Sequence, residues 1–111
     1  MHRLVFLDSA KDDLAEIAAY LRRESQSRKV ADDFIERLIQ QCETIAATAG
    51  HRGRARPELR PAYRSVTFGN YVIFLRYVAE GSESVLEVIH VLNGRRDFDA
   101  FFVRQPDDSE G

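Results

Sequence analysis

Two stretches of alternating side chains in the second half of the chain predict a β-hairpin. They cover Tyr71–Val78 and Ser84–Leu92 and are rich in the β-branched and aromatic residues that strands favour. Gly81-Ser82 lies between them. Glycine at the first central position of a two-residue turn is typical of type II′, so the sequence predicts a tight hairpin around this pair.

The turn predicts a register in which Arg76 faces Glu87 and Phe74 faces Ile89. A period of two then divides the side chains between two faces. The expected core face has no acid and no arginine; it carries Tyr71, Ile73, Leu75, Tyr77, Leu86, Val88, His90 and Leu92. The opposite face is apolar around one charge pair; it carries Val72, Phe74, Arg76, Val78, Val85, Glu87, Ile89 and Val91. Such a face indicates a surface that is covered in part, or by a partner.

A period of 3.6 in the first half predicts two amphipathic helices. They follow a short strand at Arg3–Leu7; the first is capped by Asp8 or Ser9, and Ser27 caps the second, which runs to about residue 49. Their short connection predicts an antiparallel helical hairpin. One core is expected between hairpin and sheet, formed by Leu14, Ile17, Leu21, Phe34, Leu38, Ile73, Leu75 and Val88.

The remaining segments complete the predicted fold. Residues 51–61 are expected to form a loop, residues 62–68 a strand, and residues 98–103 a short helix. The order β-α-α-β-β-β with a short C-terminal helix predicts an α+β fold, in which an antiparallel sheet is packed by the N-terminal helical hairpin. We expect a single domain over residues 1–104, followed by a polar tail at 105–111.

Charge is unevenly distributed along the 111 residues. The net charge is −2, yet residues 51–105 carry nine arginines against six acids. Arginine favours bidentate contacts with carboxylates and phosphates, which fits a protein or nucleic-acid partner. A single cysteine, Cys42, excludes an internal disulfide, and no stretch resembles a secretory signal or a membrane span. We therefore expect a cytoplasmic protein.

The sequence offers little cofactor chemistry. Its three histidines are far apart and no phosphate-binding loop or nucleophile motif is present, so we expect no cofactor, no metal and no catalytic residue. His90 is expected to be a core histidine. A cluster of Arg64, Arg76, Arg95 and Arg96 could stabilise a phosphate, but no activated acid and base accompany them.

An ordered set of motifs runs through the chain: Phe6, Ala10–Leu14, Ile17, Tyr20-Leu21, Ala31, Phe34, Leu38 and Ile45, then Gly53-Arg54, Pro57–Arg60 and Tyr63–Ser65, then Tyr71–Tyr77 and Val91–Asp97. This set resembles ParE toxins, within the ParE/RelE superfamily of bacterial type II toxin–antitoxin systems. The resemblance implies a toxin that is not itself an enzyme, inhibits DNA gyrase, and is neutralised by a ParD-like antitoxin whose C-terminal segment wraps it. No membrane partner and no sequence-specific nucleic-acid binding by the toxin alone are expected.

Two alternatives stay open at this point. One is a RelE-like ribosome-dependent mRNA endonuclease that uses Arg64, Arg95 and Arg96; however, Val72 replaces one basic position of that branch, and a phenylalanine replaces its C-terminal tyrosine. The other is an inactive remnant that only binds antitoxin. In each case the antitoxin is expected on the less covered sheet face, bringing apolar anchors and acids. The predicted partner-binding residues are Arg64, Val72, Phe74, Arg76, Glu87, Ile89, Arg95 and Arg96.

Overall fold

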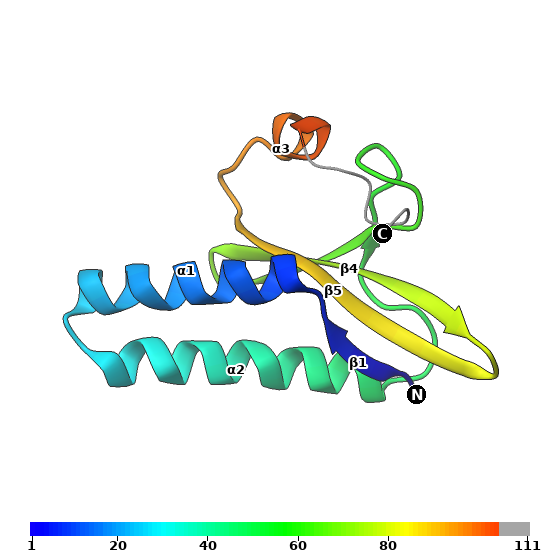
Figure 1. The fold of residues 1–111 in the computed structure, drawn as a ribbon, viewed down its shortest axis with the longest axis horizontal. Helices are drawn as coiled ribbons and strands as arrows, with labels where there is room; N and C mark the ends of the chain where they lie inside the picture. Colours follow the sequence, from blue (N-terminus) through cyan, green and yellow to red (C-terminus); the bar gives the residue numbers. More distant parts are fainter. Residues whose placement is uncertain (105–111) are drawn as a thin grey trace.

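A computed structural model describes residues 1–104 as one mixed sheet with helices on both faces (Figure 1). Its elements are β1 (Arg3–Phe6), α1 (Asp8–Ser25), α2 (Arg28–Ala47), β2 (Arg54–Ala55), β3 (Arg64–Phe68), β4 (Tyr71–Glu80), β5 (Glu83–Asn93) and α3 (Phe98–Arg104). The α+β prediction, with its helical hairpin and short C-terminal helix, is confirmed. The predicted tail at 105–111 lies outside the described residues.

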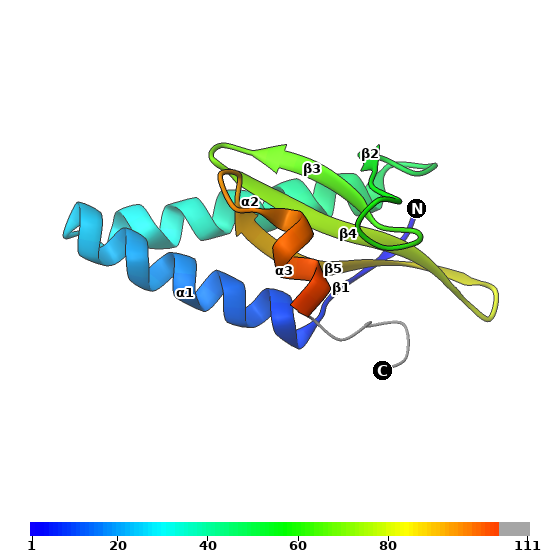
Figure 2. The ribbon, with the colours of Figure 1, turned by 90° about the horizontal axis from the view of Figure 1, so that it is seen from above.

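The sheet has the order β1-β5-β4-β3-β2. Neighbouring strands are antiparallel except β1 and β5, which run parallel, with Leu4 opposite Leu86. The sheet is therefore mixed, not wholly antiparallel. The two-residue β2, within a segment predicted to be loop, pairs with the start of β3 at the outer edge (Figure 2).

The predicted hairpin register is confirmed only near the turn. Glu80 pairs with Glu83 around a two-residue turn in which Gly81 has φ +64°, and Arg76 pairs with Glu87. The prediction that Phe74 faces Ile89 is wrong, because a β-bulge makes Phe74 the partner of His90. Beyond the bulge each β5 side chain lies on the face opposite to the one predicted.

The predicted core between hairpin and sheet is confirmed. Leu38, Ile73, Leu75 and Val88 are fully buried, and Leu14, Leu21 and Phe34 pack against them. Val91 also belongs to this core, contrary to the predicted face, as the bulge requires. Among the described residues, no helix is long and apolar enough to cross a bilayer.

The helix ends follow partly from the sequence. Ser27 caps α2 as predicted, since its side chain accepts a hydrogen bond from the backbone N–H of Val30 at 3.2 Å. The prediction of a side-chain cap on α1 is wrong. Leu7 is its N-cap residue, and Ser9 donates its hydroxyl proton to the carbonyl of Ile89 at 2.6 Å. This bond joins the first turn of α1 to β5 instead of capping the helix.

Candidate functional site

The sheet face predicted to bind a partner is covered by the chain itself. Helix α3 and the loop before β3 lie over it, on the side opposite the helical hairpin (Figures 1 and 2). They form a second core with the strands; its buried members are Leu59, Tyr63, Val72, Phe74, Ile89, Leu92 and Phe102. This part of the face is therefore occupied by the chain itself, whereas Arg76, Val78 and Glu87, nearer the hairpin turn, lie outside this core and are partly exposed.

Three phenylalanines hold α3 in place. The rings of Phe98 and Phe102 meet Phe74 edge to face, with centroids 5.0 and 5.1 Å apart. Arg60 donates a hydrogen bond from Nη2 to the carbonyl of Phe102. The sequence predicted this short helix and a face that is only partly covered. The loop residue Leu59, for which no core position was predicted, fills part of the remaining area.

His90 joins three elements beneath α3. Its Nδ1 lies 2.8 Å from Oδ2 of Asp13 on α1, and the same oxygen accepts the backbone N–H of Val91 at 2.9 Å. The His90 ring also meets Phe101 edge to face at 4.9 Å. Burial of His90 agrees with the prediction, but the bulge turns it toward α3, and its contact with Asp13 was not predicted.

Arg76 and Glu87 form the cross-strand ion pair that the register predicts. Nε of Arg76 lies 2.6 Å from Oε1 of Glu87, and the two side chains are 12% and 19% exposed. Phe74 and Ile89 are fully buried and Val72 is 8% exposed. These positions therefore serve packing in the described structure, and their binding of a partner stays a prediction.

The predicted arginines do not gather at one place. Arg64 begins β3, whereas Arg95 follows β5 at the opposite end of β3, where Phe68 pairs with Tyr71. Four residues of strand separate these ends, about 13 Å. The Arg64 guanidinium donates to the carbonyls of Arg52 and Gly53, both at 2.8 Å, and that of Arg96 lies 4.7 Å from the centroid of the Phe101 ring.

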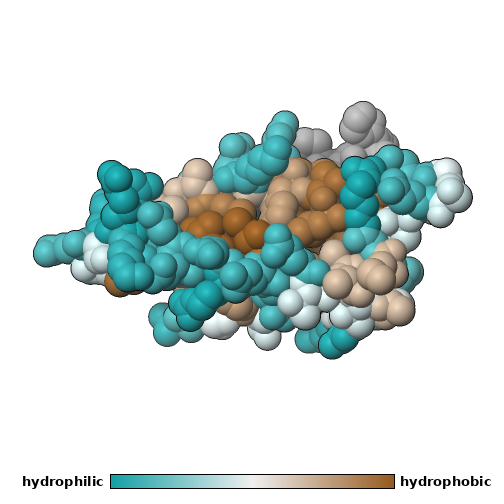
Figure 3. Space-filling model, turned by 90° about the horizontal axis from the view of Figure 1, so that it is seen from below, coloured by the Kyte–Doolittle hydropathy of each residue, from teal (hydrophilic) through white to brown (hydrophobic). Residues whose placement is uncertain are grey.

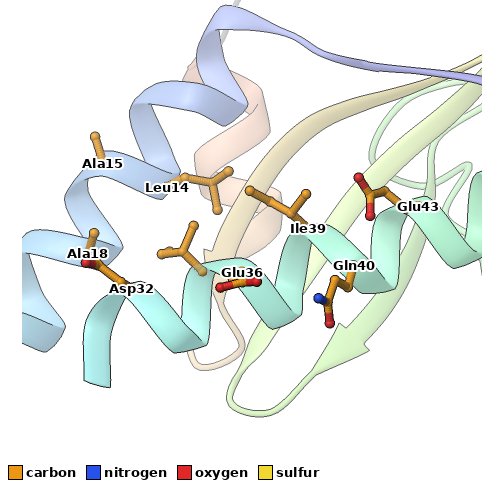
Figure 4. Close-up of a pocket in the computed structure, with 9 residues that line it drawn as sticks. Leu14, Ala15, Ala18, Asp32, Glu36, Ile39, Gln40 and Glu43 are labelled. Atoms are coloured by element: carbon orange, nitrogen blue, oxygen red, sulfur yellow. The ribbon is translucent and has the colours of Figure 1, made fainter. Parts of the chain in front are cut away.

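A surface groove that the sequence analysis missed runs between α1 and α2. It has a volume of about 530 Å³ and is lined by Leu14, Ala15, Ala18, Asp32, Ile35, Glu36, Ile39, Gln40 and Glu43. Leu14 and Ile39 point toward each other across it (Figure 4). On the side away from α3, apolar side chains are framed by polar ones (Figure 3). We call this feature the hairpin groove; its rim carries acids from α2.

The described residues contain no cluster of three or more histidine, cysteine, aspartate or glutamate side chains that would hold a metal ion. Two surface features of the described residues suit contact with another molecule: the hairpin groove with its acidic rim, and the exposed arginines near β2.

Comparison with known proteins identifies the class to which this fold belongs. Residues 4–98 match the family described as ParE toxin of type II toxin-antitoxin system, parDE. The chain therefore belongs to the ParE toxin family, which confirms the resemblance seen in the sequence.

Two curated relatives are Toxin ParE1 of Mycobacterium tuberculosis, strains CDC 1551 / Oshkosh and ATCC 25618 / H37Rv. Each is 36% identical over 69 residues, which is 62% of this chain and 66% of the relative, just under two thirds of its length. A solved structure, titled "Chromosomal ParDE TA system from P. aeruginosa", shares the fold. Its TM-score is 0.66 with 18% identity, covering 84% of this chain and 96% of that one.

Proposed function

We propose that this ParE-family toxin inhibits DNA gyrase in the cytoplasm, without acting as an enzyme, and is neutralised by a ParD-like antitoxin. The observation that carries the proposal is the family match over residues 4–98, supported by the fold shared with a chain from a ParDE system. The gyrase target comes from the resemblance to ParE toxins stated above.

The placement of the arginines favours this proposal over a RelE-like nuclease. That alternative needs Arg64 near Arg95 and Arg96, with an acid and a base beside them. Arg64 instead holds two backbone carbonyls, and Arg96 packs on Phe101. These contacts support a structural use of the same side chains.

Two parallel assays test the target. In the first, purified protein is added to gyrase, ATP and relaxed plasmid, and we expect supercoiling to be lost. In the second, it is added to translating ribosomes, and we expect the mRNA to stay intact. Cleavage of mRNA that disappears in Arg64→Ala would establish the RelE-like alternative. Inactivity in both assays, with antitoxin binding retained, would indicate the remnant.

The hairpin groove is the surface that best suits the antitoxin. Its apolar floor includes Ile35 and Ile39, both only partly buried by the chain itself. Asp32, Glu36 and Glu43 line its α2 side. An amphipathic helix with an apolar stripe and basic flanking residues complements both features. This differs from the acidic segment expected from the sequence, because the open apolar surface lies among acids.

A matched pair of lysine substitutions tests this surface. Ala15→Lys places a charge in the groove, so its burial under a partner and its repulsion by basic flanks weaken binding. Ala47→Lys adds the same side chain to an exposed position of α2 outside the groove. We expect calorimetry with the antitoxin to show at least tenfold weaker binding for Ala15→Lys and little change for Ala47→Lys. If both variants bound the antitoxin with equal affinity, the groove would not be part of the interface.

A further inference from the structure

We propose that a cleft at the β2–β3 edge of the sheet binds the phosphodiester backbone of DNA, with Arg52 and Arg54 as its phosphate ligands. The cleft has a volume of about 380 Å³ and lies beside β2, at the outer edge seen in Figure 2. It is lined by Gln41, Ile45, Arg52, Gly53, Arg54, Arg56, Ser65, Val66, Thr67 and Val72. DNA binding here goes beyond the proposed function and needs neither gyrase nor antitoxin.

The cleft is lined by three arginines and no carboxylate. Arg56 is already engaged: its Nε lies 2.8 Å from Glu58 and its Nη1 donates to the Ser65 hydroxyl at 3.1 Å. Within residues 1–104, by contrast, the exposed side chains of Arg52 and Arg54 have no hydrogen bond or ion pair. Both guanidinium groups therefore have donors open to an anion, although the Glu58 carboxylate lies near enough to Arg54 to interact with its charge.

The segment that carries these arginines is held against the sheet. Arg64 donates hydrogen bonds to the backbone carbonyls of Arg52 and Gly53. Without these bonds, the two carbonyl oxygens would repel an anion in the cleft. Gly53 has φ +87°, and an added Cβ would lie 2.9 Å from the carbonyl oxygen of Ser65. The backbone therefore approaches β3 as closely as glycine allows, so the backbone positions of Arg52 and Arg54 need little further ordering on binding.

The neighbourhood favours DNA over an acidic peptide. Of the apolar side chains that line the cleft, Ile45 and Val72 are only 5% and 8% exposed, and Val66 is partly exposed. Next to Arg52, the exposed His51 ring stacks on Tyr77 with centroids 4.2 Å apart and planes 3° apart. Aromatic rings beside arginines are typical of proteins that bind single-stranded nucleic acid, whose unpaired bases stack on them, whereas a duplex would use the arginines alone. Recognition of this kind carries no base readout, so it involves no sequence specificity.

The expected affinity is low and depends strongly on salt. Each phosphate contact contributes about −0.9 to the slope of log K against log salt, so two contacts give about −1.8. Between 50 and 200 mM salt, binding should then weaken roughly tenfold. The chain carries a net charge of −2, so no general attraction to DNA adds to these contacts.

Fluorescence anisotropy with a labelled 20-base-pair duplex tests the proposal at 50 and 200 mM salt. Arg52→Gln/Arg54→Gln is compared with Arg22→Gln/Arg23→Gln, which removes two exposed arginines from the far end of α1. We expect at least fivefold weaker binding and a slope flatter by about 1.8 for the cleft variant. The control should match the wild type.

Three further ligands in the same assay distinguish DNA from other anions that the arginines could bind. Single-stranded DNA and an RNA duplex of the same sequence share the phosphate chemistry, and tighter binding of the RNA would contradict DNA as the ligand. A labelled hexaglutamate peptide that binds through the same arginines while DNA does not would overturn the proposal in favour of a protein partner. Absence of DNA binding at 50 mM salt, or equal losses in both variants, would also overturn it, and neither result bears on gyrase inhibition.

Discussion

Replacing Leu38 with alanine tests the core that joins the helical hairpin to the sheet. Leu38 is fully buried within the cluster that includes Ile73, Leu75 and Val88. The substitution removes three carbon atoms, about 2.4 kcal/mol of transfer free energy at about 0.8 kcal/mol per buried group. The cavity left behind raises the cost to about 3–4 kcal/mol. For 111 residues this lowers the melting temperature by about 13–17 °C.

The measurement is urea unfolding followed by circular dichroism, with Val30→Ala as the control. Val30 also lies on α2 but is 50% exposed, so its truncation should change the free energy of unfolding by less than about 0.5 kcal/mol. An unchanged m-value would attribute the loss to the folded state. A Leu38→Ala variant within about 0.5 kcal/mol of the wild type would refute the placement of this side chain in the core.

Three further outcomes are expected. Burial raises the pKa of the Cys42 thiol to about 12, so iodoacetamide at pH 8 should leave the native protein unmodified and alkylate it only in denaturant. Glu87→Gln should cost about 1–3 kcal/mol by leaving the Arg76 charge poorly paired, whereas Arg76→Met/Glu87→Leu should cost less, as calorimetric melting will show. Ser27→Ala should destabilise α2 by about 1 kcal/mol in the same experiment, since the Val30 N–H loses its cap.

The helices and the hairpin turn were predicted well because their sequence patterns involve residues that are close together along the chain. The apolar spacing of α1 and α2, the Ser27 cap and the glycine turn at Gly81 each depend on neighbouring residues, and each lies where the sequence indicates. The parallel pairing of β1 with β5 had no such signal. It joins segments about 80 residues apart, and its register depends on the whole fold.

The bulge in β5 explains why the face of the sheet was misread. Residues Val88–Leu92 are apolar apart from His90. The alternation of polar and apolar residues therefore does not reveal that the strand register shifts by one residue here. Beyond Ile89 the shift sends His90 and Leu92 to the α3 side and Val91 to the hairpin side. The Asp13–His90 contact follows from that shift, and for this reason it was not predicted.

The candidate surfaces were harder to predict than the core. A helical stripe identifies the face that meets the sheet, but it does not show that Leu14 and Ile39 leave an open apolar groove between the helices. Likewise, the excess of arginines in residues 51–105 is visible in the sequence, yet only the structure distinguishes Arg64, which holds the backbone, from the exposed Arg54.

Supercoiling of relaxed plasmid by gyrase, measured with toxin alone and with toxin plus one equivalent of antitoxin, tests the central claim most directly. The proposed function predicts loss of supercoiling with toxin and its recovery with antitoxin. In the Ala15→Lys variant it predicts that more antitoxin is needed to restore supercoiling, because the antitoxin binds at least tenfold more weakly. Full supercoiling at a toxin concentration well above that of gyrase, with toxin that is folded and binds antitoxin, would contradict the claim.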